Sequence, residues 1–179
     1  MALINTTTTG IQGSTFVADG TGSLTVQQNG QTLGVFGNQP AFRAYNVAVQ
    51  NISNATWTKV QLTTELFDTN SNFDNATNYR FTPTVAGYYQ FNGQSYANYT
   101  GSPGVRIGVA LYKNGGSHAQ QELTNPSASL YGTVAISSLI YLNGTTDYVE
   151  LYALIYATGP QIYFGPTITY LDGILVKAA

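Results

Sequence analysis

The sequence predicts an all-β fold, with one packed domain of short strands and no helices. Apolar and polar residues alternate with a period of two in several short windows, as in Val105, Ile107, Val109 and Leu111, and turn-forming residues separate these windows. No window shows the apolar stripe of an amphipathic helix. The 179 residues are a typical length for one domain with its own core. Many short strands without helices are typical of a sandwich or a barrel.

The composition limits the classes of partner and of chemistry. Charged residues make up only 8% of the chain and the net charge is −2, so we expect no nucleic-acid partner, because tracking a phosphate backbone needs a basic surface. The chain contains no cysteine, which excludes disulfides and thiolate metal sites. A surface with so little charge favours a protein that is largely covered by neighbouring subunits.

No segment predicts association with a membrane. Residues 1–5 have neither the basic start nor the long apolar run of a signal peptide. The longest apolar stretches, such as residues 149–156, are too short to cross a bilayer. We therefore expect no membrane partner.

The composition changes near Pro40, which suggests two parts, residues 1–40 and residues 41–179. The first part is small and polar, with glycine at seven positions, whereas the second part holds all fourteen tyrosines and the only tryptophan. We expect residues 1–22 to form an extended arm. The packed domain should begin after Pro40.

A β-hairpin is predicted in the first part, around an Asn-Gly pair at residues 29–30. This pair is a favoured type I′ turn, because both turn positions need a positive φ. We expect Val26 to pair with Leu33 across this turn, and Leu24 to pair with Val35. A lone hairpin is marginal in water, so its apolar face would pack on the main domain, on other copies or on a host surface. The candidate anchoring residues are Leu24, Val26, Leu33 and Val35.

Four short motifs follow one another in the middle of the chain. They are Phe67-Asp68, Asn72-Phe73-Asp74, Tyr79-Arg80-Phe81-Thr82-Pro83 and Gly87-Tyr88-Tyr89-Gln90-Phe91. Strand-like segments at residues 41–44 and 170–175 and a turn at residues 111–115 surround them. Together these motifs resemble the central signature and the framework of C1q-like domains, over about residues 41 to 177.

The resemblance implies a C1q/TNF-like ten-stranded jelly-roll sandwich, which normally assembles as a homotrimer. The matched residues also suit such a fold locally. Phe81, Tyr89 and Phe91 supply large side chains for a core. Pro83 cannot donate to a strand ladder and therefore suits a strand end or edge.

The chain departs from the secreted animal members of this family, because it has no collagen-like Gly-x-y stalk. A short Gly- and Thr-rich segment stands in that place instead. This arrangement looks like virion proteins of tailed bacteriophages. The resemblance therefore implies a structural role in a virion.

The sequence gives little support for catalysis. His118 is the only histidine, so a histidine-based metal cluster is impossible, and we expect this residue in a solvated loop. No nucleophile elbow, Walker loop or dinucleotide-binding glycine motif occurs. We therefore expect no enzyme activity and no cofactor.

Glu65, Asp68 and Asp74 lie close together in the sequence and allow three interpretations. A pair of carboxylates could hydrolyse a glycan. Asp68, Asn72 and Asp74 could instead supply oxygen ligands to Ca²⁺, although their spacing matches no defined calcium loop. We favour the third interpretation, in which these side chains cap the connecting loop by accepting backbone hydrogen bonds.

The many tyrosines suggest recognition of sugars or proteins, because tyrosine combines an apolar face with a polar tip. Tyr96, Tyr99 and Tyr131 lie in or near predicted loops and are the candidates for surface recognition. A second set lies in predicted strands and is expected to pack in the core and at the trimer axis. This set is Tyr141, Tyr148, Tyr152, Tyr156 and Tyr163.

These observations predict a non-enzymatic virion protein, a trimeric capsid decoration or cement protein. We expect the N-terminal arm to dock on the major capsid protein or on another virion protein, and the jelly roll to project outward from the capsid. The alternative is a tail-fibre or receptor-binding head that recognises a host surface glycan. A secreted bacterial adhesion module also fits the fold but lacks a signal peptide. Fold alone does not decide among these functions.

Overall fold

The structure, a computed structural model, describes residues 14–18, 24–28, 31–36, 39–100, 104–125 and 131–179. The chain divides into two compact units, Met1–Gln39 and Pro40–Ala179, which we describe separately. All regular structure in the described residues is β-strand. Among these residues there is no helix with the length and apolar character needed to span a membrane.

The N-terminal unit contains one antiparallel sheet with the strand order β1–β2–β3. Its strands are β1 (Ser14–Ala18), β2 (Leu24–Gln28) and β3 (Gln31–Phe36). The predicted hairpin is confirmed as the pair β2–β3, while its turn at residues 29–30 lies outside the described residues. The expectation of an extended arm is wrong for β1, which pairs with β2 along its whole length, and the rest of the expected arm lies outside the described residues. Its branched residues, Thr15 and Val17, favour a strand.

The register within the hairpin differs from the predicted one. The observed pairs include Val26 with Gly34 and Leu24 with Phe36. The predicted partners, Leu33 and Val35, are each one residue too early. The ladder shifts between Val26 and Gln27, so that Leu33 is an extra residue on β3, as in a β-bulge. Sequence alternation alone does not reveal such an insertion.

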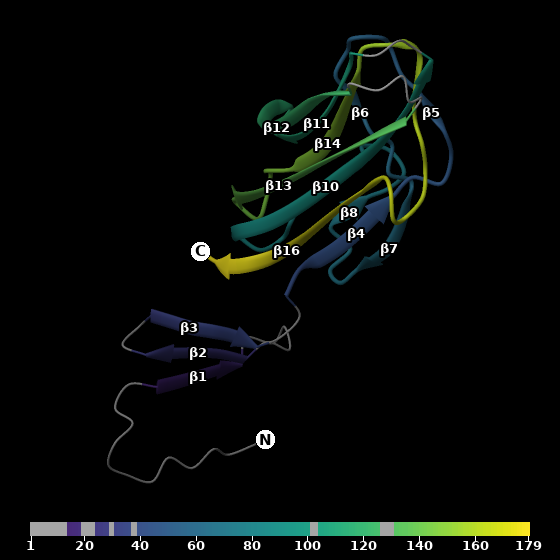
Figure 1. Cartoon of the computed structure of the whole chain (residues 1–179). Helices are drawn as coiled ribbons and strands as arrows, with labels where there is room; N and C mark the ends of the chain where they lie inside the picture. Colours follow the sequence, from purple (N-terminus) through teal and green to yellow (C-terminus); the bar gives the residue numbers. More distant parts are fainter. Residues whose placement is uncertain (1–13, 19–23, 29–30, 37–38, 101–103, 126–130) are drawn as a thin grey trace. The chain divides into compact units, whose positions relative to one another are not determined.

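Unit Pro40–Ala179 consists of two antiparallel sheets (Figure 1). The first sheet has the order β5 (Gln50–Asn51), β15 (Thr158–Ile162), β10 (Gly87–Thr100), β16 (Tyr170–Ala178), β4 (Ala41–Tyr45) and β7 (Thr64–Asp68), and β13 (Tyr131–Leu142) pairs with β10. The second sheet has the order β12 (Gly116–Asn125), β11 (Val105–Lys113), β14 (Val149–Ile155), β9 (Arg80–Phe81) and β8 (Phe73–Asp74), and β6 (Thr58–Lys59) pairs with β14. The described residues of this unit form thirteen strands rather than the expected ten, and four of them, β5, β6, β8 and β9, are only two residues long.

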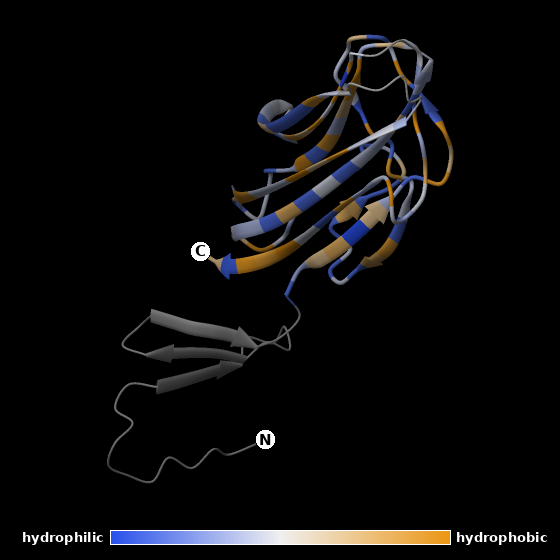
Figure 2. Cartoon of the chain, in the orientation of Figure 1, coloured by the Kyte–Doolittle hydropathy of each residue, from blue (hydrophilic) through white to orange (hydrophobic). Residues whose placement is uncertain are grey.

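The core lies between the two sheets and is rich in aromatic side chains. Buried and more exposed residues alternate along β10, and strongly hydrophilic positions recur along this strand in Figure 2, so every second residue faces the core. Phe81, Tyr89 and Phe91 are fully buried, as predicted. Phe42 stacks on Phe81 with ring centroids 4.3 Å apart. Tyr89 is accommodated because its hydroxyl donates to the carbonyl oxygen of Val85 at 2.7 Å, and burial raises its pKa.

Candidate functional site

The outer face of the first sheet carries exposed apolar side chains near the C-terminal end of β16. Tyr88 and Gln90 of β10 lie on this face, because Tyr89 between them points into the core. Leu139 of β13 and Ile174 of β16 flank Gln90 in one cross-strand row, and they are 52% and 46% exposed. Tyr88 contacts Tyr141 of β13 edge-to-face, with ring centroids 5.4 Å apart. We call Tyr88, Leu139, Tyr141 and Ile174 the apolar patch.

A polar row crosses the middle of the same face. It comprises Ser137, Asn92, Asp172 and Arg43, on β13, β10, β16 and β4. The Ser137 hydroxyl donates to Asn92 Oδ1, and Asn92 Nδ2 donates to Asp172 Oδ1, both at 2.9 Å. Arg43 Nη1 donates to Asp172 Oδ2 at 2.9 Å, and its guanidinium lies 3.7 Å from the centroid of the Tyr170 ring. Arg43 Nη2 also donates to the carbonyl oxygen of Pro166 at 2.7 Å, so the charged and amide groups of the row all have partners.

A cluster of tyrosines lies beyond the polar row. Tyr96 and Tyr163 stack with ring centroids 6.0 Å apart, and Tyr131 lies 5.8 Å from Tyr96 and 6.0 Å from Tyr163. Tyr131 is 43% exposed, and the neighbouring Phe164 is 47% exposed. The structure thus brings together two of the three predicted recognition residues and adds Tyr163. We call Tyr96, Tyr131 and Tyr163 the tyrosine cluster.

Tyr99, the third predicted recognition residue, lies in the core. The prediction of a surface position is wrong, because β10 continues to Thr100 and Tyr99 occupies one of its core-facing positions, with 3% exposure. Tyr141 and Tyr156 belong to the set expected in the core and at the trimer axis. Both are exposed in the single chain, so neither of them lies in the core, and Tyr156 comes directly after β14. Alternation along a strand shows which residues share a face, but it does not show which of the two faces is buried in the core.

The outer face of the second sheet differs, because the chain itself covers it. A Cβ atom added to Gly108 of β11 would lie 2.9 Å from Trp57 Cη2, so the indole packs directly on this strand. Ala110 lies on the same side of β11 and is fully buried. Tyr112 and Tyr152 stack on this face with ring centroids 3.8 Å apart. The apolar patch of the first sheet has no comparable cover within the described residues.

The candidate anchoring residues Leu24, Val26, Leu33 and Val35 lie in the N-terminal sheet. The structure places Leu24 and Val26 on the central strand β2, and Leu33 and Val35 on the edge strand β3. Val35 pairs with Thr25, so it belongs to a different row from Leu24. The four residues therefore do not form the single predicted face, because the bulge at Leu33 shifts the pairing.

The acidic segment between β7 and β9 is organised by loop capping. Asp68 Oδ2 accepts the backbone N–H of Phe73 at 2.7 Å. Asp74 Oδ1 accepts the backbone N–H groups of Ala76 and Thr77, and these bonds lower the pKa of Asp74 to about 2. Burial, and to a lesser extent the charge of Asp68, raises the pKa of nearby Glu65. Asn72 Oδ1 accepts the backbone N–H of Thr84 at 3.4 Å, so Asp68, Asn72 and Asp74 all accept backbone hydrogen bonds, as in the loop-capping interpretation that we favoured.

No group of three or more His, Asp or Glu side chains among the described residues is arranged to hold a metal ion. His118 is exposed, but it lies in strand β12 rather than in the expected loop. The strand begins at Gly116, directly after the tight turn at Asn114 and Gly115, which both have positive φ angles. The expected loop is therefore shorter than predicted, because Gly116 already belongs to the strand.

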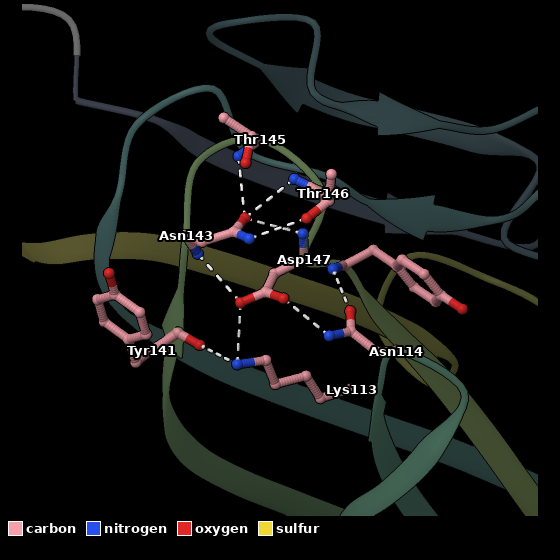
Figure 3. Close-up of polar contacts among 8 residues, drawn as sticks. Lys113, Asn114, Tyr141, Asn143, Thr145, Thr146 and Asp147 are labelled. Atoms are coloured by element: carbon pink, nitrogen blue, oxygen red, sulfur yellow. Dashed lines mark hydrogen bonds and ion pairs between the residues drawn. The ribbon is translucent and has the colours of Figure 1, made fainter.

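One end of the sandwich is fixed by a network around Asp147 (Figure 3). Asp147 Oδ1 accepts Asn114 Nδ2 at 2.7 Å, and Oδ2 accepts the N–H of Asn143 at 3.1 Å and pairs with Lys113 Nζ at 3.0 Å. The bond from Asn114 is the largest of the contacts that lower the pKa of Asp147. Asn143 Oδ1 accepts three successive backbone N–H groups, those of residues 145–147. The network ties the β11–β12 turn to the β13–β14 turn.

The two-sheet topology and the similarity to solved structures define the fold: a C1q/TNF-like jelly-roll sandwich. Solved structures similar to this chain include murine APRIL at pH 5.0, with a TM-score of 0.59 and 11% identity over 77% of this chain and 99% of that chain. Eiger TNF from S. frugiperda has a TM-score of 0.59 and 11% identity over 79% of this chain and 93% of that chain. At such identities the likeness establishes the fold alone. No protein-family model and no curated protein sequence matches the chain.

Proposed function

We propose that this protein is a non-enzymatic structural protein of a bacteriophage virion, a homotrimeric decoration protein of the capsid surface. The main observation that supports self-association is the apolar patch on the outer face of the first sheet. Exposed apolar surface beside a polar rim marks an interaction site. The fully bonded polar row beside the patch supplies such a rim.

The proposed place in a virion is supported by the sequence. The four central motifs and the short Gly- and Thr-rich N-terminal segment resemble phage virion proteins, and a charged content of 8% suits a surface covered by neighbours. In this proposal the N-terminal unit attaches the trimer to the major capsid protein or to another virion protein. The jelly roll projects outward.

A second candidate function is a receptor-binding head of a tail fibre. The tyrosine cluster favours it, because half-exposed aromatic rings stack well on sugar rings and Phe164 extends the exposed aromatic surface. In this case the trimer would bind a host surface glycan. Binding to a panel of bacterial surface polysaccharides should then fall at least tenfold in Tyr131→Ala.

Two measurements test the proposed function. Light scattering on the purified protein should give about three times the chain mass of 19.2 kDa. Antibody labelling of virions purified from the source that encodes the chain should then decorate the capsid in electron micrographs. Label confined to the tail tip would favour the receptor-binding head instead, and unlabelled virions would contradict both assignments.

A further inference from the structure

The register of the N-terminal sheet sorts its residues into cross-strand rows. Two rows consist of apolar residues and one glycine: Phe16–Val26–Gly34 and Ala18–Leu24–Phe36. The row between them is Val17–Thr25–Val35, and the row on the other side of Val26 is Thr15–Gln27–Thr32. Successive residues of a strand alternate between the two faces of a sheet, so rows two positions apart share a face. The two apolar rows therefore lie on one face, which we call the apolar row face, and the Thr-containing rows lie on the other.

The apolar row face needs a second layer, which the described part of the N-terminal unit does not contain. The described residues of this unit form a single three-stranded sheet. A sheet with one apolar face is stable when that face packs on another element. The covering layer must therefore come from outside this sheet.

The composition of the unit points to further copies of itself as the cover. Asp19 is the only charged residue in residues 1–39, so the three described strands contain no charged side chain. Identical sheets can therefore approach one another without like-charge repulsion, whereas a charged partner surface would find no complementary charge here. Gly34 follows the bulged residue Leu33 and leaves the end of the row through Val26 without a side chain.

We propose that three copies of the sheet β1–β2–β3 pack their apolar row faces together and form a three-sided stem of the trimer. This inference rests on the trimer of the proposed function. Only residues 37–39 separate β3 from the second unit, so association of three jelly rolls tethers three sheets at a high local concentration. Each sheet then supplies the layer that the other two lack. The Thr-containing face and the residues before β1 remain for attachment to a partner.

Cysteine cross-linking tests the stem directly, because the natural chain contains no cysteine. Val26→Cys introduces a single thiol at the centre of the central strand, on the apolar row face. Thr25→Cys is the matched control, one residue away on the same strand and in a row of the other face. Under mild oxidation, full-length Val26→Cys should form a disulfide-linked pair of chains on a non-reducing gel. It should do so at least tenfold faster than Thr25→Cys.

The outcomes separate the stem from the trimer on which it rests. A trimer by light scattering in which Val26→Cys does not cross-link, or cross-links no faster than Thr25→Cys, overturns the stem and leaves the trimer standing. A monomer at micromolar concentration overturns the proposed trimer itself, and the stem with it. In a trimer without cross-links, rapid reaction of Val26→Cys with a bulky maleimide would indicate an apolar row face left open for another protein. Slow reaction would indicate cover by the jelly roll. Leu24→Cys, in the second apolar row, repeats the test if Val26→Cys fails to fold.

Discussion

Gly173 shows how closely the aromatic core is packed at a single residue. It pairs with Phe91 on one side and with Phe42 on the other, in the middle of the first sheet. A Cβ atom added at this position would lie 2.8 Å from the Phe91 ring and 2.9 Å from the Phe42 ring. Both rings are fully buried and have no room to move away.

Gly173→Ala should therefore lower the free energy of unfolding by about 1–3 kcal/mol, the usual cost of overpacking a core. Denaturant unfolding measures this difference. Gly116→Ala is the control, because the nearest atom to its added Cβ is the Lys113 carbonyl oxygen at 3.6 Å, an ordinary contact. Equal stability of the two variants would mean that the core accommodates a methyl group at Gly173.

Asp74 links stability to pH. Its pKa is lowered from 3.8 to about 2 in the folded protein, so the folded state favours the charged carboxylate. The resulting stabilisation is complete above the unfolded pKa and is lost as the pH falls from about 4 to about 2. Asp74→Asn removes this charge and weakens the cap, which we expect to cost about 1 kcal/mol at pH 7.

Thermal unfolding at several pH values tests this prediction. The difference between the natural protein and Asp74→Asn should be clear at pH 7 and should shrink towards zero near pH 2. Asn75→Asp serves as a control, because it places an acid at the neighbouring, half-buried position. A difference that stays constant from pH 7 to pH 2 would contradict the assigned role of the charge.

For individual residues, the predictions were correct where a local sequence pattern supported them. Phe81, Tyr89 and Phe91 follow strict alternation and were predicted in the core, where they lie. Tyr99 was misplaced because nothing in the sequence marks how far β10 continues. The contact between Tyr163 and Tyr96 joins residues far apart in the chain, and no local pattern could have revealed it.

Among the elements, the two turns at the Asp147 end of the sandwich depend on a single side chain for their stability. Asp147 accepts bonds from Asn114, Asn143 and Lys113 and thereby joins two turns. Asp147→Ala should lower the free energy of unfolding by about 1–3 kcal/mol, because it leaves several donors without their acceptor. Thr145→Ala is the matched control in the same loop, since the recorded bond of Thr145 comes from its backbone N–H. Chemical denaturation of both variants compares them, and equal losses would contradict the central position of Asp147.

The elements were predicted best where the apolar pattern is long and least well where it is short. The strands β10 and β11 correspond to windows with apolar alternation, and β14 corresponds to a continuous apolar run. The strand β1 was missed because it lies in a Gly- and Thr-rich stretch, and its pairing with β2 becomes visible only in three dimensions. The bulge at Leu33 was missed for a related reason: an inserted residue changes the partner of every following residue without changing the composition.

At the scale of the whole molecule, the proposed trimer depends on the apolar patch. Leu139 is 52% exposed in the single chain and would be buried in the assembly. Burying such a side chain is worth about 1.5–3 kcal/mol, which corresponds to roughly tenfold to hundredfold in a dissociation constant. Leu139→Asp should therefore shift the trimer towards monomers at micromolar concentration in analytical ultracentrifugation.

The control for this prediction is Asn54→Asp, which adds the same charge at an exposed position in the connection between β5 and β6. It should leave the mass unchanged. Circular dichroism should show that both variants keep the jelly roll. If Leu139→Asp remains fully trimeric, the interface lies elsewhere on the molecule.

The C1q/TNF-like jelly roll of residues 41–179 was predictable because the four central motifs carry specific residues at specific spacing. The outer faces were not predictable in the same way. Gly108 and Trp57 are 51 positions apart in the sequence, and only the fold shows that one covers the other. The contrast between a covered sheet and an open one therefore had to come from the structure.

The central position of β16 also determines how the chain reaches its native state. β16 fills the place between β10 and β4, and the ion pair of Arg43 with Asp172 joins positions 129 apart. Such distant pairings require large loops to close, and the entropy of loop closure is lost before any stabilising contact forms. All-β chains of this kind therefore fold in milliseconds to seconds rather than microseconds. During that time β4 and β10 have open edges, which can pair with another chain. The yield of refolding should therefore fall as the protein concentration rises, although the finished sheet leaves neither edge open.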